Sequence, residues 1–140
     1  MAESSYEILE HTADIRIRVK ADNLERLFCR SAQAMFEIIA EKKPGPSGGT
    51  ELVKVSQKAA DLEELFINWL NELLSLSSVR RLVFSGFRIK ELTETAVSAE
   101  VSGGKIRDYV INKEIKAATY HQLKLSKDRC GWKAEVIFDV

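Results

Sequence analysis

The feature that most constrains the fold is the order in which the hydrophobic periodicity changes along the chain. Apolar and polar residues alternate over 6–20, which predicts a strand with one buried and one solvated face. Apolar residues then recur at helical spacing over 22–41 and again over 61–77, which predicts two amphipathic helices. A short strand over 51–57 separates the helices, and alternating segments fill most of the chain after residue 79.

This order predicts an α+β fold with a mixed, largely antiparallel sheet packed with two amphipathic helices. The 140 residues suit a single domain, 1–140, with a substantial core. Each predicted helix begins at an aspartate with a glutamate three residues later, and this spacing is typical of a capping box. The pairs are Asp22 with Glu25 and Asp61 with Glu64.

The charge balance argues against a partner recruited by a general electrostatic field. Lysine and arginine total 21, and so do aspartate and glutamate. We therefore expect no strong direct nucleic-acid binding, although a local basic patch remains compatible with this balance. No apolar run approaches the roughly 18 residues that span a bilayer. The N-terminus lacks the features of a signal peptide, so we expect a cytoplasmic protein with no membrane contact.

The familiar catalytic motifs are absent from the sequence. It contains no GxSxG elbow, no GxxxxGK[ST] loop, no GxGxxG and no zinc-ligand cluster of cysteine and histidine. The two cysteines, Cys29 and Cys130, form no CxxC pair. The two histidines fall on different predicted strands, and His121 lies on the more apolar face of its strand, as a core histidine would. Nothing here predicts nucleophilic catalysis.

Carboxylates at two predicted strand ends offer a different chemistry. Asp14 lies where the first strand becomes regular, and Asp139 precedes Val140 at the end of the sequence. If the first and last strands are neighbours, these two carboxylates and that of Val140 converge on one hard cation, since Ca²⁺ and Mg²⁺ prefer oxygen ligands. The alternative is that Asp14 only forms a local turn and Asp139 is only a solvated end.

Further polar residues lie in the segment "EIKAATYHQL". Lys116 and Tyr120 share one face of this predicted strand, opposite His121. Lys116 is either a functional cation or a solvated strand lysine. Tyr120 either uses its hydroxyl in function or packs its ring against the protein with the hydroxyl exposed to solvent.

At this point four segments carry a resemblance. "EHTADIRI", "DLEELFINWLNELL", "EIKAATYHQL" and the terminal "FDV" occur in the order found in the archease family, and the likeness covers essentially the whole chain. The resemblance implies an accessory protein of tRNA splicing and RNA repair. It implies a partner, a GTP-dependent RNA ligase, whose active-site histidine becomes guanylylated faster and over multiple turnovers. It also implies a divalent cation, Ca²⁺ first, with Mg²⁺ or Mn²⁺ as alternatives.

The resemblance also implies roles for particular residues. Asp14, Asp139 and the Val140 carboxylate would be the metal ligands. Glu10, Asp22 and Lys116 would be activation candidates near the same site, with Lys116 contacting the ligase or its nucleotide. Glu10 departs from the family pattern, in which aspartate is usual. The segment "SGGKIRDYVINKE" also lacks a Gly-Glu and a histidine that many relatives carry, so no role of those residues is transferred.

Two other functions compete with the activator hypothesis. A metal-dependent phosphohydrolase would use the same acids, but the sequence offers neither a second metal cluster nor a clear general base. A chaperone-like modulator of a tRNA methyltransferase is the other alternative, which the family resemblance also implies. We therefore predict a non-catalytic, metal-binding activator of an RNA ligase.

Overall fold

Within residues 6–11 and 14–140, the structure has three antiparallel sheets and two α-helices. The computed structural model describes residues 6–11 and 14–140, without the side chains of Glu10 and His11. The largest sheet has the order β1-β2-β9-β8, with bounds Tyr6–His11, Asp14–Ala21, Gly131–Asp139 and Ala117–Asp128. A second has the order β4-β6-β5, with bounds Thr50–Lys58, Ala96–Lys105 and Leu82–Leu92. The α+β prediction is confirmed, with three sheets in place of one.

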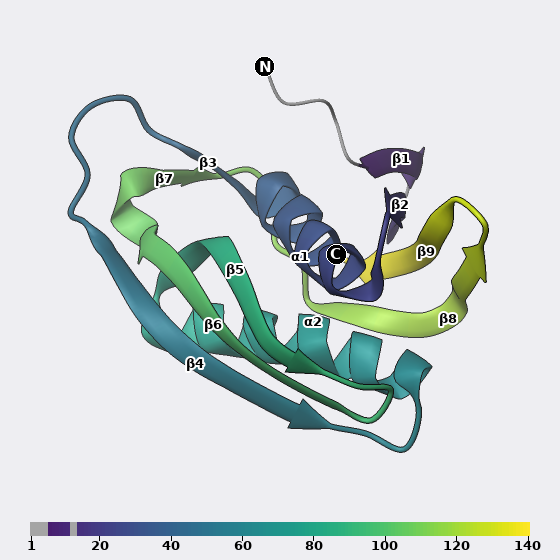
Figure 1. The fold of residues 1–140 in the computed structure, drawn as a ribbon. Coiled ribbons are helices and arrows are strands. Elements are labelled where there is room, and N and C mark those ends of the chain that lie inside the picture. Colours follow the sequence, from purple (N-terminus) through teal and green to yellow (C-terminus); the bar gives the residue numbers. More distant parts are fainter. Residues whose placement is uncertain (1–5, 12–13) are drawn as a thin grey trace.

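Both helices contact both of the larger sheets. Helix α1 (Leu24–Ile39) packs on β5 and β2, while α2 (Leu62–Arg80) packs on β8 and β4 (Figure 1). Their apolar sides meet at an aromatic cluster in which the Phe28 and Phe66 rings lie edge to face, 5.3 Å apart. The indole N–H of Trp69 donates to the carbonyl of Phe28 at 3.0 Å, so this buried polar group is satisfied. One continuous core results.

The two helices begin with different versions of the predicted cap. Asp61 caps α2 as predicted, since its carboxylate accepts a hydrogen bond from the Glu64 N–H at 2.8 Å. In α1 the cap is Asn23, whose side-chain oxygen accepts from the Arg26 N–H at 2.8 Å. The prediction of Asp22 as the cap was therefore wrong by one residue, because both neighbouring side chains have a suitable oxygen.

The predicted single strand over 6–20 is two strands. β1 and β2 pair antiparallel, with Tyr6 opposite Val19 and His11 opposite Ile15, and a register shift lies between Ile8 and Glu10. β2 continues inward and pairs along its whole length with β9. The last strand of the chain is therefore an inner strand of its sheet, between β2 and β8 (Figure 1).

The predicted clean alternation of β8 is interrupted. The register against β9 shifts between Thr119 and Lys124, and Gln122 has a φ of 55°, in the left-handed region. His121 lies within this irregular stretch and is exposed, whereas Ala118, which precedes it, is buried. The prediction of a core position for His121 was therefore wrong, because strict alternation does not hold across a bulge.

The region after the first helix is extended rather than helical. α1 ends at Ile39, and β3 (Ala40–Lys42) pairs with β7 (Tyr109–Ile111), which follows the short 3-10 helix η1 (Ile106–Asp108). The sequence pattern of residues 108–114 was ambiguous and predicted neither a helix nor a strand. None of the helices within 6–11 and 14–140 is long and apolar enough to cross a membrane.

Candidate functional site

Two aspartates face each other at one end of the four-stranded sheet. Asp14 begins β2, Asp139 ends β9, and the two are direct partners in the antiparallel register. Their neighbours Ile15 and Phe138 are partners on the inner face and are buried. The aspartates therefore share the outer face, where directly opposed residues have Cβ atoms about 5 Å apart. The predicted convergence of the first and last regular strands is present.

Among the described residues, the two carboxylates have no compensating basic partner. In the described part of the chain, no basic side chain lies within ion-pair distance of Asp14 or Asp139. Like charges directly opposite each other destabilise a sheet. Lys20 and Lys133 are also opposed, but long flexible side chains can separate their charges and short aspartates cannot. A bound cation would turn the aspartate repulsion into attraction.

The candidate ligands that the described residues offer at this end are oxygens. Among the described residues, no group of three histidine, cysteine, aspartate or glutamate side chains forms a metal cluster. The candidate set is therefore Asp14, Asp139 and the carboxylate of Val140, whose side chain packs against the core. An all-oxygen set with open positions suits Ca²⁺, Mg²⁺ or Mn²⁺, which accept carboxylates and retain water.

Lys116 lies beside the aspartate pair. Its backbone N–H donates to the carbonyl of Asp139 at 2.8 Å, and the following residue, Ala117, is the β8 partner of Asp139. The Lys116 side chain is exposed. The structure thus brings Asp14, Asp139, Val140 and Lys116 to one end of the sheet.

The other two candidates are placed differently. The backbone of Glu10 pairs with Arg16 on β2, near Asp14, but the side chain of Glu10 lies outside the described part. Asp22 follows the far end of β2, about 25 Å from Asp14 along the strand. There it lies against the β8–β9 hairpin, beside Gly131. The expectation that Asp22 is near the same site was wrong.

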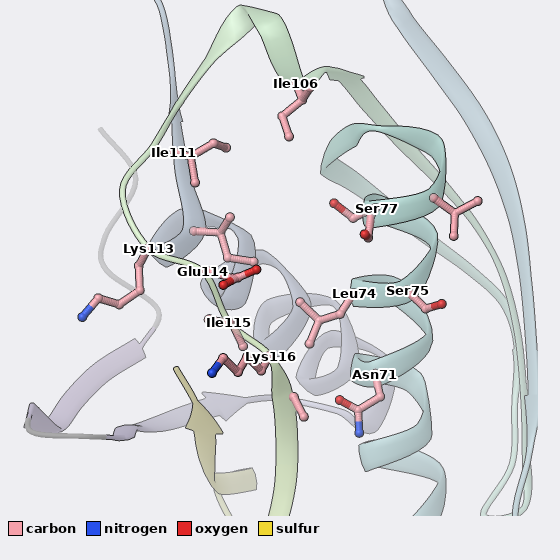
Figure 2. A pocket seen from close by; sticks show the side chains of 14 residues that line it. Asn71, Leu74, Ser75, Ser77, Ile106, Ile111, Lys113, Glu114, Ile115 and Lys116 are labelled. Atoms are coloured by element: carbon pink, nitrogen blue, oxygen red, sulfur yellow. The ribbon is translucent and has the colours of Figure 1, made fainter.

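A groove of about 830 Å³ adjoins this end of the sheet. It lies between the C-terminal half of α2 and the segment 111–117, with Glu114 and Lys116 on one wall and Leu74 and Ser75 on the other (Figure 2). Asn71 closes its lower end, because its side-chain amide donates to the Ala118 carbonyl at 3.0 Å and accepts from the Ala118 N–H at 2.7 Å. This pair of bonds fixes the start of β8 to α2.

A buried charge cluster on the same face was missed by sequence reasoning. Glu135 on β9 is only 6% exposed and accepts hydrogen bonds from Arg16 at 2.9 Å and Arg18 at 3.2 Å. Burial alone raises the pKa of Glu135, but the two arginines outweigh it and hold this pKa below its usual range. The sequence predicted both arginines to be solvated. The available signal was a lone glutamate inside the apolar run "AEVIF".

Two solved structures share this fold. The solution structure of Methanobacterium thermoautotrophicum protein 1598 has a TM-score of 0.73 at 24% identity, covering 99% of this chain and 100% of that one. The crystal structure of a Thermotoga maritima protein described as an archease, possible chaperone, has a TM-score of 0.66 at 26% identity, covering 96% of each chain. The chain is therefore one of a class of small α+β domains with a shared architecture.

The sequence comparisons specify the family. Residues 6–140 match the model of the Archease protein family (MTH1598/TM1083). The archease of Methanosarcina acetivorans is 39% identical and that of Methanosarcina mazei 40%, each over 96% of this chain and 95% of the relative. This chain belongs to the archease family, which confirms the resemblance drawn from its motifs.

Proposed function

We propose that this protein is a non-catalytic, metal-binding activator of a GTP-dependent RNA ligase in tRNA splicing and RNA repair. It would act in the cytoplasm by promoting guanylylation of the ligase histidine and multiple turnover. The observation that carries the proposal is the opposed, uncompensated pair Asp14 and Asp139 at one exposed end of the sheet. Family membership supports the choice of partner.

The proposal assigns each residue at this end a task. Asp14, Asp139 and the Val140 carboxylate would hold the cation, which supplies positive charge that neutralises nucleotide phosphates. Lys116 would add a cationic side chain beside that site, held in place by its backbone bond to Asp139. Its placement fits a contact with the ligase or its nucleotide. Because both aspartates are exposed, the protein can present this end to a partner.

The test is ligase guanylylation. The RNA ligase of the same organism is mixed with labelled GTP and a divalent cation, with and without this protein, and covalent label on the ligase is followed over time. We expect faster and more complete labelling with the wild type. Asp14→Ala and Asp139→Ala should lose this stimulation while unfolding at a denaturant concentration no lower than that of the wild type.

Asp22→Ala is the matched control for this experiment. It removes the same type of exposed side chain from the other end of β2. We expect Asp22→Ala to retain stimulation. Full stimulation by Asp139→Ala at unchanged metal dependence would refute the role of the aspartate pair. Loss of stimulation in all three variants would show that stimulation depends on the overall negative charge of the protein and not on the aspartate pair.

A second candidate is a chaperone-like modulator of a tRNA methyltransferase. It is favoured by the description of the T. maritima relative as a possible chaperone. The large groove beside α2, with its apolar residues, is compatible with a protein partner. An active ligase that does not respond to this protein, together with a methyltransferase that does, would favour this second function.

A further inference from the structure

A second cleft, separate from the aspartate pair, concentrates positive charge. It has a volume of about 280 Å³ and lies where α2, β4, β6 and η1 meet. Four of its six lining residues are basic and one is acidic; the basic ones are Arg80, Arg81, Lys105 and Arg107. The whole chain carries no net charge, so this clustering is local and is not a consequence of a basic composition.

Compensation of the helix dipole explains only part of this cluster. Basic side chains at the C-terminal end of a helix are stabilised by its partial negative charge, and this accounts for Arg80 and Arg81. Lys105 ends β6 and Arg107 lies in η1, so neither belongs to the helix. Over the described residues, Arg80 alone among the four forms an ion pair, a long one to Glu51 at 3.9 Å between partly exposed side chains.

The backbone at Arg81 provides an independent observation. Arg81 has φ 56° and ψ 50°, the left-handed conformation, and its N–H donates to the Ser77 carbonyl at the end of α2. Glycine is the usual residue at this position because a Cβ there is unfavourable. Arg81 therefore places a long cationic side chain in the lining of the cleft at a position where glycine would relieve backbone strain.

The volume and the lining residues of the cleft indicate which class of ligand it can bind. Pockets for small molecules are usually larger and lined by apolar or aromatic side chains, whereas this cleft has Ile106 as its one apolar residue and no aromatic ring to hold a base. Three of the four cations are guanidinium groups, whose planar donors match phosphate oxygens. The cleft therefore suits phosphates of a chain rather than a free nucleotide.

We propose that this cleft binds backbone phosphates of RNA. The choice of RNA over an acidic protein segment rests on the proposed function, in which the substrate of the partner ligase is RNA. Binding is independent of base sequence, because no aromatic side chain lines the cleft and phosphate contacts carry no sequence information. Four cationic contacts to a single strand give a slope of log K against log salt of roughly −2 to −3.

The test is direct RNA binding without the ligase. A short, unstructured oligouridylate labelled with fluorescein is titrated with the protein, and anisotropy is followed at salt concentrations from about 50 to 200 mM. We expect salt-dependent binding that weakens severalfold in Arg81→Gly and in Arg107→Ala, with the slope reduced by about 0.7 for each. Arg81→Gly should unfold at the same temperature as the wild type or higher, because glycine relieves the strain.

The matched control carries Arg88→Gln and Lys58→Gln together. Both residues are exposed and lie on β5 and β4, outside the lining of the cleft. This control should bind RNA nearly as well as the wild type. An equal loss in the control would overturn the proposal by showing that binding follows overall charge. So would unchanged binding in Arg107→Ala and Arg81→Gly, or no binding by the wild type.

Competition experiments distinguish RNA from other negatively charged ligands. Polyglutamate that displaces the RNA at equal charge concentration would overturn the proposal in favour of an acidic protein partner. Displacement by submillimolar inorganic phosphate or GTP would overturn it in favour of a small-anion site. These assays contain no ligase, so RNA binding and ligase activation can each fail independently of the other.

Discussion

The outer face of the four-stranded sheet carries two charged groups that are built in opposite ways. Glu135 is buried between Arg16 and Arg18, so its charge is compensated within the protein. Asp14 and Asp139 are exposed and face each other, and neither forms an ion pair with a basic side chain of the described residues. They lie on the same two strands, β2 and β9.

The two groups differ in what they contribute to the fold. A buried charge is tolerated only when it is paired and hydrogen-bonded, and Glu135 meets that condition. An exposed like-charge pair contributes nothing favourable to the sheet, and the proposed cation would offset that repulsion. Stability measurements can therefore break or sharpen this distinction.

The largest expected effect is at the buried group. Glu135→Ala leaves two arginines without their shared acceptor and should reduce the free energy of unfolding by about 3 kcal/mol. This lies at the lower end of the usual range because the arginine side chains are 20% and 33% exposed. Urea unfolding of the wild type and of Glu135→Ala measures this loss of free energy. A loss below about 1 kcal/mol would show that the cluster behaves like a surface ion pair.

A neutral polar anchor near the aspartate pair should have the next largest effect. Asn71→Ala removes both hydrogen bonds to Ala118 and should lower the free energy of unfolding by about 2 kcal/mol. Hydrogen exchange should then quicken at the start of β8 before it quickens elsewhere. Exchange that rises equally throughout the sheet would instead show that Asn71 supports the core as a whole.

The pH dependence of stability should follow Glu135. Its pKa is lower in the folded protein than in the unfolded chain, so its charge stabilises the fold above the unfolded pKa. That contribution is lost as pH falls through the folded pKa. Between about pH 5 and pH 3 the wild type should lose more stability than Glu135→Gln. Parallel pH profiles for the two proteins would contradict this assignment.

The smallest effect, a gain in stability, is expected at the exposed pair. Asp14→Asn should raise the free energy of unfolding by about 0.5 kcal/mol in a chelator, because it removes a like-charge repulsion. Added Ca²⁺ or Mg²⁺ should raise the melting temperature of the wild type and leave that of Asp14→Asn almost unchanged. An equal response to the metals in both proteins would place their binding elsewhere.

The sequence predicted both helices, because periodicity is a local signal. It predicted that Asp14 meets Asp139 only if the first and last strands are neighbours, and the structure supplies that pairing. The sequence did not predict that residues 6–20 contain two strands in place of one, since it lacks the usual glycine or asparagine-glycine signal of a hairpin there. The bulge at Gln122, beside the exposed His121, is likewise invisible to a period-two pattern.

The remaining misses come from long-range packing. Arg16 and Glu135 are 119 positions apart in the chain, and no local pattern connects them. Family resemblance predicted Asp22 as an activation candidate near the metal ligands, but the direction of β2 carries it to the opposite end of the sheet. Tertiary structure alone decides which of several acids are neighbours.

The position of β9 between β2 and β8 has a consequence for synthesis on the ribosome. The four-stranded sheet cannot form completely until residues 131–139 have left the exit tunnel. The edge of β2 that pairs with β9 therefore stays unpaired while more than a hundred residues are translated. During this interval its apolar side chains Ile15, Ile17 and Val19 lack the strand that completes their sheet. Closure then joins Asp14 to Asp139 in the same step, so a nascent chain acquires its proposed cation site only when its fold is complete.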